Sequence, residues 1–137
     1  MMMKKNKDKK PAGILLGSHF GLERGILVCF SLAGYELCHA PTLAEARMYL
    51  EASNYDFVFC FENFVDGSAL DFAYSLNQER LINAIALVDN GRIGTYYRNE
   101  SPKIFHFFYV KTSPDILRFF VDQLLGINRL QMKLSQN

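Results

Sequence analysis

Long hydrophobic runs are absent from the 137 residues, so the sequence predicts no membrane-spanning helix. A secretory signal peptide is absent as well, because Pro11-Ala12-Gly13 precedes a hydrophobic run of only three residues, 14–16. Glycine-rich phosphate loops of the dinucleotide-binding and Walker types are also missing. These absences argue against membrane proteins, secreted proteins and the common nucleotide-binding enzymes.

Cysteines are few, and tryptophan is absent. Cys29, Cys38 and Cys60 are odd in number, lie inside apolar segments, and have a spacing that fits no zinc motif. We therefore expect buried, reduced thiols, as in cytoplasmic proteins, and neither a disulfide framework nor a metal centre.

Charge of one sign does not dominate the sequence. The formal net charge is +1, but the first ten residues hold five Lys and one Asp, which leaves ten Lys/Arg against thirteen Asp/Glu and a charge of −3 for the rest. A slightly acidic body has no electrostatic footprint for nucleic acid. The basic start has low hydrophobicity, and we expect residues 1–11 to form a disordered leader or to be a cloning remnant.

Half of the residues are hydrophobic, twelve of them Phe, which is enough for one domain with a phenylalanine-rich core. Five short apolar runs are predicted as strands: residues 14–16, 35–39, 55–61, 82–88 and 104–110. The third run is apolar throughout from Phe57, which is typical of a strand covered on both faces in a parallel sheet.

Segments of helical period follow the strands. They cover residues 22–32, 43–52, 69–79 and 93–98, and a last helix is expected from residue 114 to beyond residue 130. Thr42 with Glu45 forms a capping box, and Ser113 before Pro114 is a strong helix start. Gly34 is expected to end the first helix.

Strands that alternate with helices predict a parallel sheet with right-handed crossovers and helices on both faces. We therefore predict a doubly wound α/β domain over residues 12–130, with five parallel strands in the order 2-1-3-4-5. Residues 131–137 are expected to be a tail or the start of a linker.

Several short stretches resemble one family. They are Gly34-Tyr35-Glu36-Leu37, Ala40, Ala44-Glu45-Ala46, Leu50, Tyr55-Asp56, Asp66-Gly67, Val110-Lys111 and residues 113–125. In their order and spacing, over residues 13–130, they are similar to the receiver domain of bacterial response regulators. The resemblance implies a receiver-like, flavodoxin-like fold.

Receiver chemistry uses five groups at the carboxyl ends of the strands. The resemblance implies two acids that help to bind Mg²⁺, an aspartate that accepts a phosphoryl group, a Ser or Thr, and a lysine. The matching positions here are Gly17 and Ser18 (or Ser18 and His19), Phe61, Val88 and Lys111. Only the lysine is kept, so the resemblance implies a degenerate member with no catalytic residue, no metal and no cofactor.

Alternatives remain open at three residues. Lys111 could bind an anion, although we favour an ion pair with Asp89 or Glu62. Glu62 could imitate a phosphorylated state if the third strand slipped by one residue, which the strong register of buried strands disfavours. His19 has no second ligand at metal-binding spacing, and with Ser18 it lacks the nucleophile-elbow motif of hydrolases.

Aromatic residues are dense in the last third of the sequence. Tyr96, Tyr97 and Tyr109, together with the aromatic strand 104–110, could form an apolar patch on the face of the predicted helix 93–98, this strand and the last helix. Receivers use this face for dimerisation and output. The alternative is that these aromatic residues belong to the core.

We therefore predict a non-enzymatic, cytoplasmic signalling module that acts by protein–protein contact and without phosphorylation. It would belong to a bacterial two-component or transcriptional regulator, with a protein partner or effector domain, without direct contact to nucleic acid or membrane, and with a homodimer as one arrangement. The alternative is a small flavodoxin-like ligand-binding domain or enzyme that uses the cleft at the strand ends.

Overall fold

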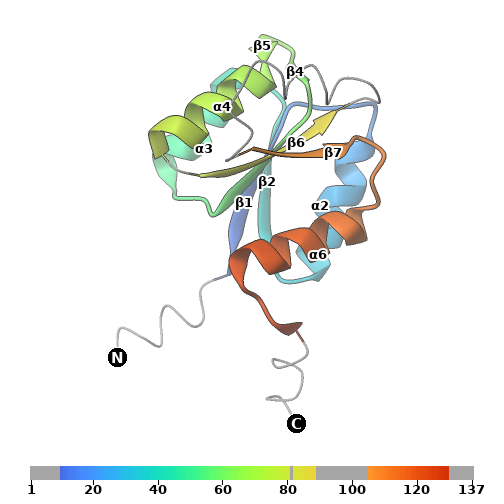
Figure 1. Ribbon diagram of the computed structural model, residues 1–137. Helices are drawn as coiled ribbons and strands as arrows, with labels where there is room; N and C mark the ends of the chain where they lie inside the picture. The colour runs from blue at the N-terminus through green and yellow to red at the C-terminus, as the bar shows by residue number, and fades with distance from the viewer. Residues whose placement is uncertain (1–9, 81, 89–104, 130–137) are drawn as a thin grey trace, which may run out of the picture.

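Five parallel strands form a single sheet in the order β2-β1-β3-β6-β7 (Figure 1). The structure is a computed structural model that describes residues 10–80, 82–88 and 105–129. The strands are β1 Ala12–Leu16, β2 Glu36–Ala40, β3 Phe57–Cys60, β6 Asn83–Val88 and β7 Phe105–Tyr109. This order confirms the predicted doubly wound, receiver-like α/β fold.

Helices cover both faces of the sheet (Figure 1). They are α2 Leu22–Leu32, α3 Leu43–Ala52, α4 Ala69–Arg80 and α6 Pro114–Leu125. One buried cluster joins the sheet to α3 and α4, and a second joins it to α2 and α6. Side chains alternate between the faces of a strand, so Phe57, Phe59 and Phe61 enter the second cluster while Val58 and Cys60 enter the first.

The helix ends follow the capping residues. The side chain of Thr42 accepts a hydrogen bond from the Glu45 N–H at 3.2 Å, and that of Ser113 accepts one from the Asp115 N–H at 3.3 Å. The predicted bounds 22–32 and 43–52 are confirmed.

The expectation that the last helix runs beyond residue 130 was wrong. The helix α6 ends at Leu125, because Gly126 adopts a left-handed φ of 71° and its N–H bonds to the carbonyl of Gln123. The predicted helix 93–98, most of the leader 1–11 and the tail 131–137 lie outside the described residues.

A two-stranded hairpin was not expected from the sequence. The strands β4 Asn63–Phe64 and β5 Gly67–Ser68 pair antiparallel within the connection between β3 and α4. No helix in the described part of the chain is both long and apolar enough to cross a membrane.

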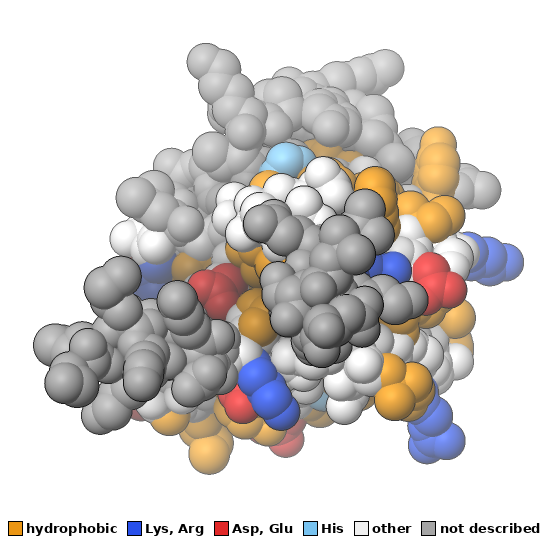
Figure 2. Space-filling view, turned by 90° about the horizontal axis from the view of Figure 1, so that it is seen from below, with side chains coloured by type: hydrophobic (Ala, Val, Ile, Leu, Met, Phe, Trp, Pro, Cys, Tyr) orange, Lys and Arg blue, Asp and Glu red, His pale blue; other side chains and the backbone are white. Residues whose placement is uncertain are grey.

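Large hydrophobic side chains reach the surface in several places. Among the large hydrophobic residues that the structure describes, the most exposed are Phe20, Leu32 and Val65. On the face in Figure 2, hydrophobic side chains are dispersed among Lys/Arg and Asp/Glu side chains.

Candidate functional site

The carboxyl ends of β1 and β3 lie side by side, because Leu16 is in register with Cys60. Gly17 follows β1 with a φ of 82°, in the left-handed region that glycine adopts without strain. Its N–H donates to the carbonyl of Ala40 at 2.9 Å, and its carbonyl accepts from Nε2 of His39 at 2.7 Å. Both the N–H and the carbonyl of Gly17 therefore already have hydrogen-bond partners within the chain.

Phe61 occupies the position that the resemblance assigns to the phosphoryl acceptor, and it is fully buried. Its N–H donates to the carbonyl of Leu16 at 2.9 Å, which extends the pairing of β1 and β3 by one residue. Its ring belongs to the buried cluster that includes Ile26 of α2 and Val110. An apolar ring, which has no nucleophilic atom, thus lies just past the end of β3.

The ring of His19 lies over Phe61. The two ring centroids are 5.9 Å apart with planes at 26°, and the ring of Phe20 meets His19 edge-on at 5.1 Å. From the sequence, His19 was a candidate metal ligand or catalytic group, and its stacking on Phe61 was not predicted. A neighbouring pair of aromatic rings after β1, opposite a phenylalanine after β3, could have predicted this stack.

Glu23 holds the loop before α2 in place. Its Oε1 accepts from the N–H of His19 at 3.2 Å. Burial works to raise the pKa of Glu23, but hydrogen bonds from the backbone and the charge of His39 outweigh it, so the pKa lies below its ordinary value. The carboxylate of Glu23, on the first turn of α2, is therefore held by hydrogen bonds from the backbone.

The other two positions of the predicted site differ in exposure. Val88 is fully buried, and its carbonyl accepts from the N–H of Val110 at 2.8 Å. Lys111 is exposed, and Asp89, one of its two expected partners, lies outside the described residues. Ser18 is exposed and Glu62 is half-buried.

Within residues 10–80, 82–88 and 105–129, no three His, Cys, Asp or Glu side chains are placed to hold a metal ion. Cys60 is fully buried in β3, and burial raises the pKa of its thiol far above its ordinary value.

The predicted interface is described in part. Tyr109, on the edge strand β7, is 50% exposed, and Ile116 and Phe119 of α6 are exposed as well. Tyr96 and Tyr97 lie outside the described residues.

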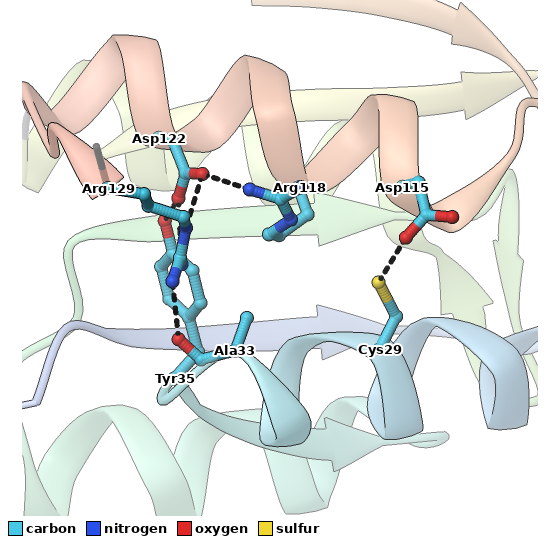
Figure 3. A network of polar contacts seen from close by, with 7 residues as sticks. All are labelled: Cys29, Ala33, Tyr35, Asp115, Arg118, Asp122 and Arg129. Carbon is cyan, nitrogen blue, oxygen red and sulfur yellow. Dashed lines mark hydrogen bonds and ion pairs between the residues drawn. The ribbon is translucent and has the colours of Figure 1, made fainter. Parts of the chain in front are cut away.

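A polar network connects the end of α2 to the end of α6 (Figure 3). The buried carboxylate of Asp122 accepts from the Tyr35 hydroxyl at 2.6 Å, from Arg118, and from Nε and Nη2 of Arg129 at 2.7 and 3.0 Å. Arg129 also donates to the carbonyl of Ala33 at 3.0 Å. The carboxylate is 4% exposed, so the donors replace water around it.

Ionisation within this network is shifted by its own contacts. Burial works to raise the pKa of Asp122, but the hydrogen bonds from Arg129, Tyr35 and Arg118 outweigh it and hold the pKa below its ordinary value. Burial and the bond to Asp122 raise the pKa of Tyr35 well above its ordinary range, and the bond to Asp122 raises that of Arg129.

The sequence reasoning missed this network. The one local indication was Arg118 four residues before Asp122 on a helix, which is the spacing of an ion pair. Tyr35 is 87 residues away from Asp122, and their contact depends on the fold.

Known structures share this fold. A putative response regulator from Chloroflexus aurantiacus matches with a TM-score of 0.73 and 16% identity, over 86% of this chain and 99% of that one. The chemotaxis response regulator CheY4 of Vibrio cholerae matches with a TM-score of 0.72 and 11% identity, over 84% and 98%. A sensor protein from a Polaromonas species matches with a TM-score of 0.66 and 15% identity, over 80% and 90%. No protein-family model and no curated protein matches the sequence.

Proposed function

We propose that this chain, whose fold is that of receiver domains, is a signalling module that works by protein–protein contact and without phosphorylation. It would act in the cytoplasm as part of a bacterial two-component or transcriptional regulator. The observation that carries the proposal is Phe61, a buried benzyl ring at the place of the acceptor aspartate.

The surroundings of Phe61 support this proposal. Phosphoryl transfer relies on positioned metal ions and cationic groups that neutralise the charge of the transferred group. Here Gly17 and Ser18 offer no carboxylate, Val88 offers no hydroxyl, and Lys111 is the one group of the five that is kept. Mg²⁺ prefers oxygen ligands, and these positions supply none from a charged side chain.

We expect that incubation with acetyl phosphate and Mg²⁺ leaves the intact mass of the protein unchanged, because no carboxylate is available as an acceptor at residue 61. A receiver domain with its acids intact, treated in the same tube, controls for the phosphodonor. A base-labile phosphoryl adduct, or Mg²⁺-dependent shifts of the amides around Phe61, would contradict the proposal.

We also propose that the domain self-associates through the face of β7 and α6, where Tyr109, Ile116 and Phe119 are exposed. Interfaces centre on a few aromatic anchors that lose their contact with water. The residues Tyr96 and Tyr97 remain predicted members of this face.

Tyr109→Glu is expected to weaken the dimer roughly tenfold or more in sedimentation equilibrium, because a buried unpaired carboxylate is unfavourable. Tyr97→Glu is predicted to act in the same direction. Met48→Glu on α3, exposed on the opposite layer of the molecule, is the control and should leave the association unchanged. A dimer that survives both tyrosine substitutions would place the interface elsewhere.

A further inference from the structure

A groove of about 880 Å³ runs between α2 and α6. Gly25 and Val28 of α2 line one side, and Pro114 and Arg118 of α6 line the other. Figure 3 shows α6 beside α2, with the guanidinium of Arg118 turned to Asp122 of the same helix. The groove is separate from the strand ends and from the face of β7 that carries Tyr109.

Two aliphatic side chains of the groove are turned to water. Val28 is 53% exposed and Leu32 is 85% exposed, and the two are four residues apart on one side of α2. One exposed aliphatic residue is ordinary, and a pair that lines a groove is a candidate contact surface.

Gly25 keeps this groove open. Glycine inside a helix is less favourable than alanine. A Cβ on Gly25 would meet only Cγ of Pro114, at 3.7 Å, which is an ordinary contact. Packing within the chain therefore does not require glycine here, whereas a longer side chain at this position would enter the groove.

The charge around the groove is positive in excess. Arg24, Arg118 and Arg129 line it together with a single acid, Asp115. Arg118 and Arg129 share the one carboxylate of Asp122 behind them, so that carboxylate neutralises only one of the two guanidinium charges. An occupant with carboxylates would find complementary charge.

We propose that the groove docks an acidic amphipathic helix of a partner protein. Aliphatic side chains of that helix would lie over Gly25, Val28 and Leu32, and its carboxylates would face Arg24 and Arg118. A helix suits the site because two packed helices leave a groove for a third, and apolar residues at helical spacing fill such grooves. This inference rests on the proposed function, since it names the partner for signalling by protein contact.

Selection from a displayed library of random peptides of about fifteen residues, with the full chain as bait, tests the proposal. The enriched peptides are expected to be net negative, with apolar residues at i, i+3 or i+4, and i+7. Titration of such a peptide into the ¹⁵N-labelled chain should shift the amides of Gly25, Val28 and Arg118. Enrichment of basic peptides, of peptides without helical spacing, or of none, would overturn the proposal.

Variants locate the binding. Gly25→Leu, which fills the groove, and Arg24→Glu, which reverses an exposed charge, are each expected to raise the Kd for the selected peptide roughly tenfold or more. Arg47→Glu makes the same charge reversal at an exposed site on α3 and should bind like the wild type. Thermal melting of each variant tests whether it is folded. If Gly25→Leu is not folded, the Kd of Arg24→Glu decides the question.

A Kd for the selected peptide that neither groove variant changes would overturn the proposal. Self-association of the wild type that is lost in Gly25→Leu would also overturn it, because the groove would then bind a second copy of the chain. Failure of the groove proposal can be distinguished from failure of the proposed function. Phosphorylation of the chain would remove the proposed function and leave the peptide data standing. Absence of peptide binding in an unphosphorylated chain would remove only the groove proposal.

Discussion

Phe61→Asp is expected to lower the free energy of unfolding by about 4 kcal/mol, because it removes a fully buried ring and places a carboxylate in an apolar cluster. Urea denaturation, followed by circular dichroism, measures the change as a shift of the midpoint at constant m-value. Phe61→Leu is the control, since it keeps the position apolar, and it should lose only about 1–2 kcal/mol. An aspartate variant as stable as the wild type would show that residue 61 faces water and that the register of β3 is wrong.

This prediction bears on function as well as on stability. In a receiver site the acceptor aspartate is tolerated because cations and donors surround it. Here the ring of His19 lies over residue 61, and Gly17 has a left-handed backbone whose carbonyl is already bonded to His39. We therefore expect Phe61→Asp to remain unphosphorylated, because the acid alone does not restore the groups around it.

The order of the strands could be predicted because it depends on local patterns. Apolar runs too short for helices alternate with helical periods, and the rule of right-handed crossovers leaves few arrangements. The starts of α3 and α6 could also be predicted, since Thr42 and Ser113 bond to backbone N–H groups within three residues of themselves. Burial of Phe61 followed from the continuous apolar character of the third strand.

Other features depend on contacts that local patterns do not contain. The end of α6 was missed because Gly126 stands between apolar residues that continue the helical period, and its left-handed conformation became evident only in the fold. The hairpin of β4 and β5 contains too few residues to show an alternating pattern. The groove between α2 and α6 needs two helices whose packing is not encoded in either one alone.

Asp122→Ala is expected to lower the free energy of unfolding by about 3 kcal/mol, because it leaves the Tyr35 hydroxyl and two guanidinium groups without their shared acceptor. The side chains of Arg118 and Arg129 are 25% and 35% exposed, so water can reach them when the carboxylate is removed. The expected loss of stability therefore lies in the lower part of the range for broken buried ion pairs. Asp115→Ala is the matched control on the same helix: its carboxylate is exposed and accepts only a weak bond from Cys29, so the loss should stay below about 0.5 kcal/mol.

The dependence of this effect on pH separates the charge from the packing. The pKa of Asp122 is lower in the folded protein than its ordinary value, so the folded state favours the ionised form. The stability that the charge contributes is therefore fully present above the ordinary pKa of an aspartate, about 3.9, and is lost as the pH falls through the folded pKa. Asp122→Asn keeps the shape and an acceptor oxygen without the charge. The free energy of unfolding of this variant should differ from that of the wild type at pH 7 and approach it in acid. Urea midpoints at pH 7 and pH 3 measure both differences. A difference that stays constant between the two pH values would mean that Asp122 acts through packing and neutral hydrogen bonds alone.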